Sequence, residues 1–200
     1  MFDNLREDLR QARKINVGPS WGSQYLKILI QPMTLAVVVY RFGRSIRRFP
    51  IPILRHALYV VSAIVRFMVE IATGIIISPG ADIGPGFVVH TPYGVFVGPT
   101  KIGKNCVVQH GVVIGYGARG IGDNVFFGPG AKVIGNAKIG SNVVVMANSV
   151  VITDVPDNLT VAGVPVRIRL PRGSTLKFRE RAERGNGFEA RAARKLTSKV

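Results

Sequence analysis

Three histidines are the residues best suited to move a proton near neutral pH in this chain. His56 follows Arg55 in an aliphatic segment, and we expect it to lie on the surface of a helix. His90 and His110 lie instead in a glycine-rich region of short aliphatic pairs. Cys106 is the only cysteine, so the chain offers no thiol pair for a disulfide or for zinc. The search for a catalytic base therefore narrows to His90 and His110, and no metal site is predicted.

A period of six residues places these two histidines relative to each other. Over residues 77–156 an aliphatic or aromatic residue recurs every six positions, and a small or β-branched residue follows four positions after it. Two single-residue insertions, one within 90–95 and one around Gly120, leave thirteen hexads. Each hexad predicts a short strand and a corner, with the first and fifth side chains pointing inward. Three hexads close one coil, so the pattern predicts a parallel β-helix of about four coils.

Counting in coils puts His90 and His110 on the same side of successive coils, to within one residue. The same column continues to Pro129 and then to Ala147. Both histidines stand outside the inward positions, so neither should be a core histidine. A long, thin cofactor could lie along this strip with its reactive end at the histidines, held mainly by backbone groups. The alternative is that both histidines are exposed corner residues without a catalytic role.

The first 73 residues have helical rather than six-residue spacing. Ser20–Arg48 and Pro52–Thr73 have the length of helices, and the prolines at 50 and 52 interrupt between them. The tail after residue 171 has nine basic and three acidic residues and few large apolar ones, which predicts a solvated helix with frayed ends. We therefore expect three parts: a helical region over 1–73, the β-helix over 74–166, and a basic C-terminal tail over 167–200.

A net charge of +16 predicts attraction to polyanions. Arginines beside the aliphatic faces of the N-terminal helices allow two interpretations: a cap on the first coil or contact with a neighbouring subunit, or peripheral contact with the inner membrane face. A membrane-spanning helix is not expected, because the uncharged stretch Ala57–Val65 is only nine residues long. The basic tail lacks an aromatic platform, which argues against nucleic acid as a partner. The first residues contain no apolar signal segment, so we expect a cytoplasmic protein.

The hexads, the segment VVHTPYGVFVGPTKIG and the segment DVPDNLTVAGVPVRIR resemble the hexapeptide-repeat acyltransferases, specifically their serine acetyltransferase-like branch. The opening MFDNLREDLR and the helical LAVVVYRFG share the resemblance, which therefore covers most of the chain. It implies a left-handed β-helix, assembly as a homotrimer, and an O-acyltransferase that binds acetyl-CoA in a cleft between adjacent prisms. No metal is implied.

The resemblance also implies roles for individual residues. His90 matches the histidine that takes the proton from the acceptor hydroxyl, although the family pattern H-x-x-G is H-x-x-x-G here. This extra residue makes His110 the second candidate for the base. The CoA contacts of the family fall on Pro129 and Ala147, and Arg167 is placed to contact a CoA phosphate.

Two departures from the branch concern the acceptor. Serine acetyltransferases carry an aspartate where this chain has Ile76, and a longer, histidine-containing loop where it has IGYGARGIG. The loss of a carboxylate weakens support for an imidazolium. The hydroxyl of a sugar or polysaccharide precursor is therefore the expected acceptor, with serine for cysteine biosynthesis as the first alternative. A non-catalytic or metal-binding hexapeptide-repeat protein is the second alternative.

Overall fold

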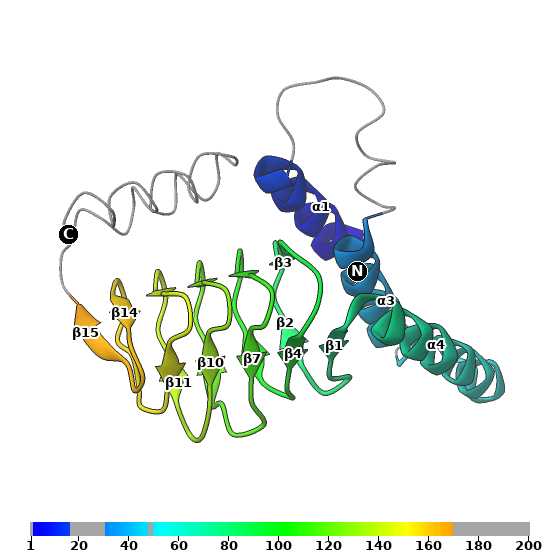
Figure 1. Ribbon diagram of the computed structural model, residues 1–200. Helices are drawn as coiled ribbons and strands as arrows, with labels where there is room; N and C mark the ends of the chain where they lie inside the picture. The colour runs from blue at the N-terminus through cyan, green and yellow to red at the C-terminus, as the bar shows by residue number, and fades with distance from the viewer. Residues whose placement is uncertain (1, 17–30, 48–49, 170–200) are drawn as a thin grey trace.

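The computed structural model describes residues 2–16, 31–47 and 50–169. Helices α1 (Phe2–Asn16), α3 (Pro32–Ile46) and α4 (Pro52–Thr73) are followed by a stack of short strands. Figure 1 shows the strands side by side along one axis, with the helices gathered at the end that carries β1. The bounds of α4 match the predicted helix, whereas 17–30 and most of the basic tail lie outside the described residues.

The strands form three sheets that run along the stack. One sheet has the order β1-β4-β7-β10-β13, the second β11-β8-β5-β2, and the third β15-β14-β12-β9-β6-β3. Neighbouring strands pair in parallel and come from successive coils, except that β15 runs antiparallel to β14. The strands are β1 (Ile75–Ile77), β2 (Asp82–Ile83), β3 (Val88–Val89), β4 (Val95–Val97), β5 (Lys101–Ile102), β6 (Val107–Val108), β7 (Val113–Ile114), β8 (Gly120–Ile121), β9 (Phe126–Phe127), β10 (Lys132–Val133), β11 (Lys138–Ile139), β12 (Val144–Val145), β13 (Val150–Val151), β14 (Thr160–Ala162) and β15 (Arg167–Arg169).

The predicted parallel β-helix is confirmed, with five strand layers where the hexad count gave about four. The additional layer is completed at the C-terminal end of the repeat region, where β14 continues the stack beyond residue 156. At the other end, β1 begins at Ile75 but contains Ile77 of the first counted hexad, so it adds no layer. An isolated parallel bridge between Ile139 and Val155 carries the second sheet into this last coil.

Counted in sixes with one inserted residue within 90–95, the sequence places Phe96 at an inward first position, and this prediction is wrong. Val95 and Val97 point into the prism and are buried, while Phe96 lies between them on the outer surface and packs its ring against Tyr116, with centroids 5.4 Å apart. The corner after Val89 holds two more residues than a regular hexad instead of one, and the next face is one residue shorter. The total length is unchanged, so the register recovers at the following coil.

The interior is a set of stacked columns of aliphatic side chains. In the third sheet, for example, the register aligns Val89, Val108, Phe127, Val145 and Val161, all of which are buried. Parallel in-register pairing places like side chains one layer apart, so each fills the space between its neighbours. Burial of this apolar surface, at about 25 cal/mol per Å², is the main source of stability of the prism.

Asparagines make the corner between the second and third sheets. Asn105, Asn124, Asn142 and Asn158 all have positive φ angles between 55° and 62°. Their side-chain amides form a ladder, in which each Nδ2 donates to the Oδ1 of the next asparagine at 3.0–3.3 Å. Asparagine tolerates this left-handed backbone better than other residues with a side chain, which explains its recurrence at these corners.

A buried ion pair fixes the helices to the first coil. Arg41 of α3 donates to the Asp8 carboxylate of α1 at 2.8 Å and to the backbone oxygen of Ile83 at 2.5 Å. Asp8 in turn accepts the backbone N–H of Phe87 at 2.9 Å. Burial raises the pKa of Asp8, while the hydrogen bonds and charge of Arg41 oppose that shift. Helices α1 and α3 thus cover the first coil, as the cap interpretation predicted.

Replacing Asn142 with alanine should destabilise the fold by about 2 kcal/mol. Alanine tolerates the left-handed backbone of this corner less well than asparagine, and the substitution also removes two hydrogen bonds of the ladder. Urea unfolding of the variant measures the change. Asn136→Ala is the matched control, since Asn136 is exposed and has no positive φ, and it should shift stability by less than about 0.5 kcal/mol. Equal effects of the two substitutions would contradict a structural role for the ladder.

Candidate functional site

The corner that follows the third sheet brings the two predicted histidines together. Because the register aligns Val89, Val108, Phe127 and Val145, the residues that follow these strands also form columns. The first column contains His90, Gln109, Gly128 and Met146, and the second contains Thr91, His110, Pro129 and Ala147. His90 therefore lies one layer from Gln109, and His110 is offset from it by one residue, within the tolerance of the hexad count.

A threonine hydroxyl joins the two histidine layers. The Oγ1 atom of Thr91 accepts the backbone N–H of His110 at 2.9 Å and lies 3.0 Å from the Nδ1 atom of the same residue. It also lies 3.3 Å from Oε1 of Gln109. The hydroxyl has one hydrogen, so it donates either to Gln109 or to the His110 ring. When it donates to Gln109, Nδ1 of His110 carries a proton and Nε2 is left as a base. Sequence reasoning missed Thr91 and Gln109, which only the strand register reveals.

The two histidines differ in their surroundings. His110 is exposed, whereas His90 is half-buried and its Nδ1 atom is shielded from solvent. The backbone of His90 is held by its N–H, which donates to the oxygen of Val108 at 2.9 Å. A half-buried imidazole is better placed to act on a ligand held against the corner than an exposed one.

The inserted residues after His90 are anchored to the end of α4. Tyr93 has a φ angle of 73°, and its N–H donates to the oxygen of Thr73 at 2.9 Å, while the N–H of Val95 donates to the oxygen of Gly74 at 3.2 Å. The oxygen of Tyr93 accepts the N–H of Gly111 from the next coil. The extra residue that breaks the family spacing is thus part of an ordered corner, and it ties the histidine corner to the helical cap.

Apart from Met146, the columns continue as a strip of small or flat residues. Gly128 has no side chain, and a β-carbon there would come within 2.6 Å of the backbone nitrogen of Ala147. Pro129 is half-buried and Ala147 is exposed. The backbone oxygens of His110 and Pro129 accept N–H groups from the next layer, so hydrogen bonds fix the backbone of the strip. It can accommodate an elongated ligand without displacing large side chains.

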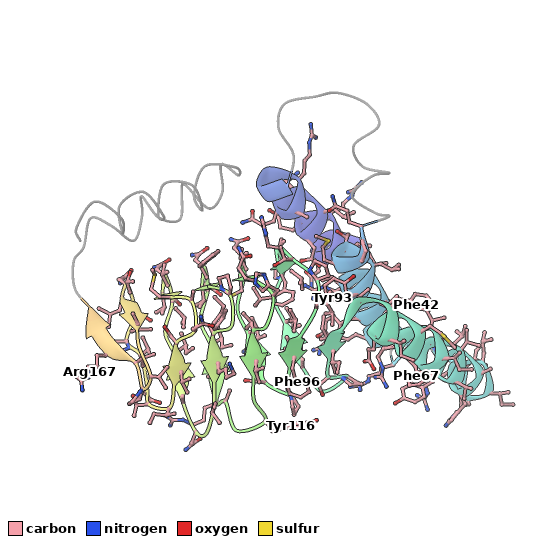
Figure 2. The ribbon with its side chains drawn as sticks, viewed as in Figure 1. Phe42, Phe67, Tyr93, Phe96, Tyr116 and Arg167 are labelled. Atoms are coloured by element: carbon pink, nitrogen blue, oxygen red, sulfur yellow. The ribbon has the colours of Figure 1, made fainter. Side chains whose placement is uncertain are left out.

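Arg167 closes the strip at the far end of the prism. It is exposed and pairs with Ala162, the residue that continues the His90 column in β14. Figure 2 shows Arg167 at one end of the strand stack, with Tyr93 beside the helices at the other end. Five steps between strand layers of about 4.8 Å separate β3 from β15, which is roughly 24 Å. The strip therefore has a histidine end and a cationic end.

The other positions singled out by the sequence lie apart from this corner. His56 is exposed on α4, with Nδ1 2.7 Å from the oxygen of Pro52, as predicted for a helix-surface residue. Ile76 faces outward on β1 and its register partner is Phe96. The short turn 115–119 is held by the Tyr116 ring contact and by an ion pair between Arg119 and Asp154. Within the described ranges, no group of three histidine, cysteine or acidic residues is arranged to hold a metal ion.

Comparisons with known proteins point to one family. Residues 120–153 match the bacterial transferase hexapeptide family (six repeats). A serine acetyltransferase from Synechococcus elongatus is 31% identical over 208 residues, covering 100% of this chain and 81% of that protein. A crystal structure of Neisseria gonorrhoeae serine acetyltransferase in complex with serine has a TM-score of 0.68 at 26% identity, covering 84% of this chain and 68% of that one. A serine acetyltransferase in complex with CoA has a TM-score of 0.65 at 25% identity, covering 84% and 68%.

The aligned region is shorter for other relatives. The serine acetyltransferase of Staphylococcus xylosus is 42% identical, but the match covers 55% of this chain and 55% of that protein. The chain thus spans about half the length of such relatives, and the match to the solved structures extends over both the helices and the β-helix.

Proposed function

Because the chain belongs to the serine acetyltransferase branch of the hexapeptide-repeat acyltransferases, we propose that it is an O-acetyltransferase that uses acetyl-CoA as donor. The supporting observation is the histidine corner, which this left-handed β-helix places at one end of a long strip of small residues. Acetyl-CoA is a co-substrate in this reaction, and the proposed site uses no metal. We place the reaction in the cytoplasm, as the sequence predicts.

His90 acts as the general base in the proposed reaction. It takes the proton from the acceptor hydroxyl, and the oxygen attacks the thioester carbonyl of acetyl-CoA. The tetrahedral intermediate then expels the CoA sulfur, which receives the proton from the imidazolium, and the acetyl ester is released. His110 and its Thr91 hydroxyl flank the same point and are the second candidate for this role.

The strip from Gly128 to Arg167 is the proposed path of CoA. The acetyl thioester lies at the histidines, the pantetheine arm follows Pro129 and Ala147, and Arg167 contacts a phosphate. A strip on the outer corner of a narrow prism is one wall of a cleft, so we propose that a neighbouring copy in a homotrimer supplies the other wall.

Serine is the acceptor that the comparisons favour. The relative that aligns with the whole chain is named a serine acetyltransferase, and a structure of similar fold contains serine. The sugar hydroxyl favoured by the sequence alone is not confirmed by these findings. We therefore propose O-acetylation of serine as the first reaction to test.

A carbohydrate hydroxyl is the second candidate, because of two features of this chain. Position 76 presents an exposed isoleucine where the resemblance implies an aspartate, and residues 115–119 form a compact turn without a histidine. Release of CoA from acetyl-CoA should be measured with serine and with a panel of sugars, and the chain should be tested for rescue of a cysteine auxotroph. Release with serine and rescue support the first candidate, whereas release only with sugars replaces serine by a carbohydrate acceptor.

Substitution His90→Ala should lower kcat by about 10²- to 10⁴-fold, the usual effect of removing a positioned general base. Affinity for CoA, measured by calorimetry, should stay near the wild-type value, because the imidazole acts on the acceptor proton. The parallel variant His110→Ala should have the smaller effect. If His110→Ala is the more damaging change, the base is His110 and the assignment of His90 is wrong.

Substitution Ala147→Phe should raise KM for acetyl-CoA about tenfold, because a ring would stand in the path of the pantetheine arm. The matched control is Thr153→Phe, since Thr153 is also exposed but lies outside both columns of the strip. Steady-state kinetics at saturating acceptor separate KM from kcat. An unchanged KM in Ala147→Phe, or an equal rise in both variants, would rule out this path.

A further inference from the structure

Helix α4 is amphipathic, but its polar face packs inward and its apolar face is exposed. Its polar residues Ser62, Arg66, Glu70 and Thr73 are spaced along one stripe that faces inward, where Ser62 and Thr73 are buried. The opposite face is apolar and exposed over roughly half the circumference at 100° per residue. The exposed apolar residues are Ile53, Leu54, Val60, Val61, Ile64, Val65, Phe67, Met68 and Ile71.

The exposed face is too large to be ordinary surface. Only 6% of an 18-residue stretch of α4 is buried, and by length and composition alone the helix is apolar enough to cross a membrane. Phe42 of α3 is also exposed, and Figure 2 shows Phe42 and Phe67 on the helix pair, away from the strand stack. Soluble monomers rarely expose a continuous apolar patch larger than roughly a few hundred Å². We therefore expect a membrane or a second protein surface to cover this face.

Contacts of the cap make α4 lie along a surface rather than cross one. Its neighbour α3 is tied to the first coil by Tyr40, whose hydroxyl donates to the oxygen of Ala81 at 2.7 Å, and by buried Arg41. Gly43 of α3 faces Ser62 closely, so the polar stripe of α4 packs on a helix that is itself fixed to the prism. The sequence argument against a membrane-spanning helix rested on the short uncharged stretch, and this packing leads to the same conclusion.

The charges of the same region identify the occupant. From residue 9 to residue 69 the sequence contains ten lysines and arginines and no aspartate or glutamate. Of these, Arg10, Arg41, Arg44 and Arg66 form ion pairs with Glu7, Asp8, Asp82 and Glu70, and the others include Arg47 and Arg55. Arg47, at the end of α3, and Arg55, in the first turn of α4, are exposed. A second copy of this chain would bring the same positive charges to the contact. An anionic lipid surface instead accepts the apolar face and attracts the arginines.

We propose that the outer face of α4 docks in the plane of an anionic phospholipid membrane, with the α3–α4 turn at the headgroups and the prism extending into the aqueous phase. The apolar residues enter the boundary between headgroups and acyl chains, while Arg47 and Arg55 reach the phosphates. This inference rests on the exposed helix and the acid-free segment, and it holds whether or not the proposed acetyl transfer is correct.

Vesicle sedimentation of the full chain tests the proposal. The wild type should sediment with vesicles of phosphatidylcholine containing phosphatidylglycerol and much less with phosphatidylcholine alone. The double variant Ile64→Gln/Ile71→Gln should lose about tenfold or more in partitioning. The matched control, Ile134→Gln/Ile152→Gln, changes two similarly exposed isoleucines of the prism and should bind as the wild type does. Circular dichroism confirms that both variants are folded.

Three outcomes would overturn the proposal. The first is a wild type that sediments with neither kind of vesicle, and the second is an Ile64/Ile71 variant that binds as well as the control. The third is equal binding to neutral and anionic vesicles, which would remove the role of the arginines. If the wild type does not bind vesicles, and light scattering shows that the Ile64/Ile71 variant forms a smaller assembly than the wild type, then a second copy of the chain covers this face.

Discussion

Parallel, in-register stacking of inward aliphatic side chains is the constraint on which the rest of the structure depends. Each buried Val or Ile of one coil packs on its counterpart in the next, so the register cannot slip by one residue without turning a whole column outward. The same rule that aligns the core also aligns the corners outside it. The candidate site is therefore a consequence of core packing, since residues that follow aligned strands must form columns of their own.

Much of this could be predicted from the sequence because the repeat is regular. The six-residue period predicted the parallel β-helix and the strip that contains His110, Pro129 and Ala147. It failed at Phe96, where one corner is longer and the next face shorter by compensating amounts. A period cannot locate two irregularities that cancel, whereas hydrogen bonds from Tyr93 and Val95 to the end of α4 show what the longer corner does.

The polar partners of the histidines were also beyond the reach of the sequence. Gln109 and Thr91 become neighbours of the site only through a one-residue offset between layers. Which face of α4 is exposed could not be predicted either, for a different reason. Its apolar spacing is typical of a core helix, and only the packing shows that the polar stripe faces inward. The comparisons, in turn, supplied serine as the favoured acceptor, which no property of the corner itself distinguishes from another hydroxyl compound.

The helical cap and the histidine corner form one connected unit. Thr73 ends α4 and accepts the N–H of Tyr93, three residues after His90, while the buried pair of Asp8 and Arg41 holds the remaining helices on the same coil. A surface that holds α4 would thereby also orient the proposed acetyl-transfer site. The end of the prism with the histidines would face that surface, and the end with Arg167 would point away from it.

A crystal structure of the chain with CoA tests the central claim most directly, because that claim is a position in space. The account predicts that the CoA sulfur lies at hydrogen-bonding distance, about 3 Å, from His90 or His110, with the pantetheine arm over Pro129 and Ala147. CoA bound along either of the other two corners of the prism, or with its sulfur at the Arg167 end, would contradict it.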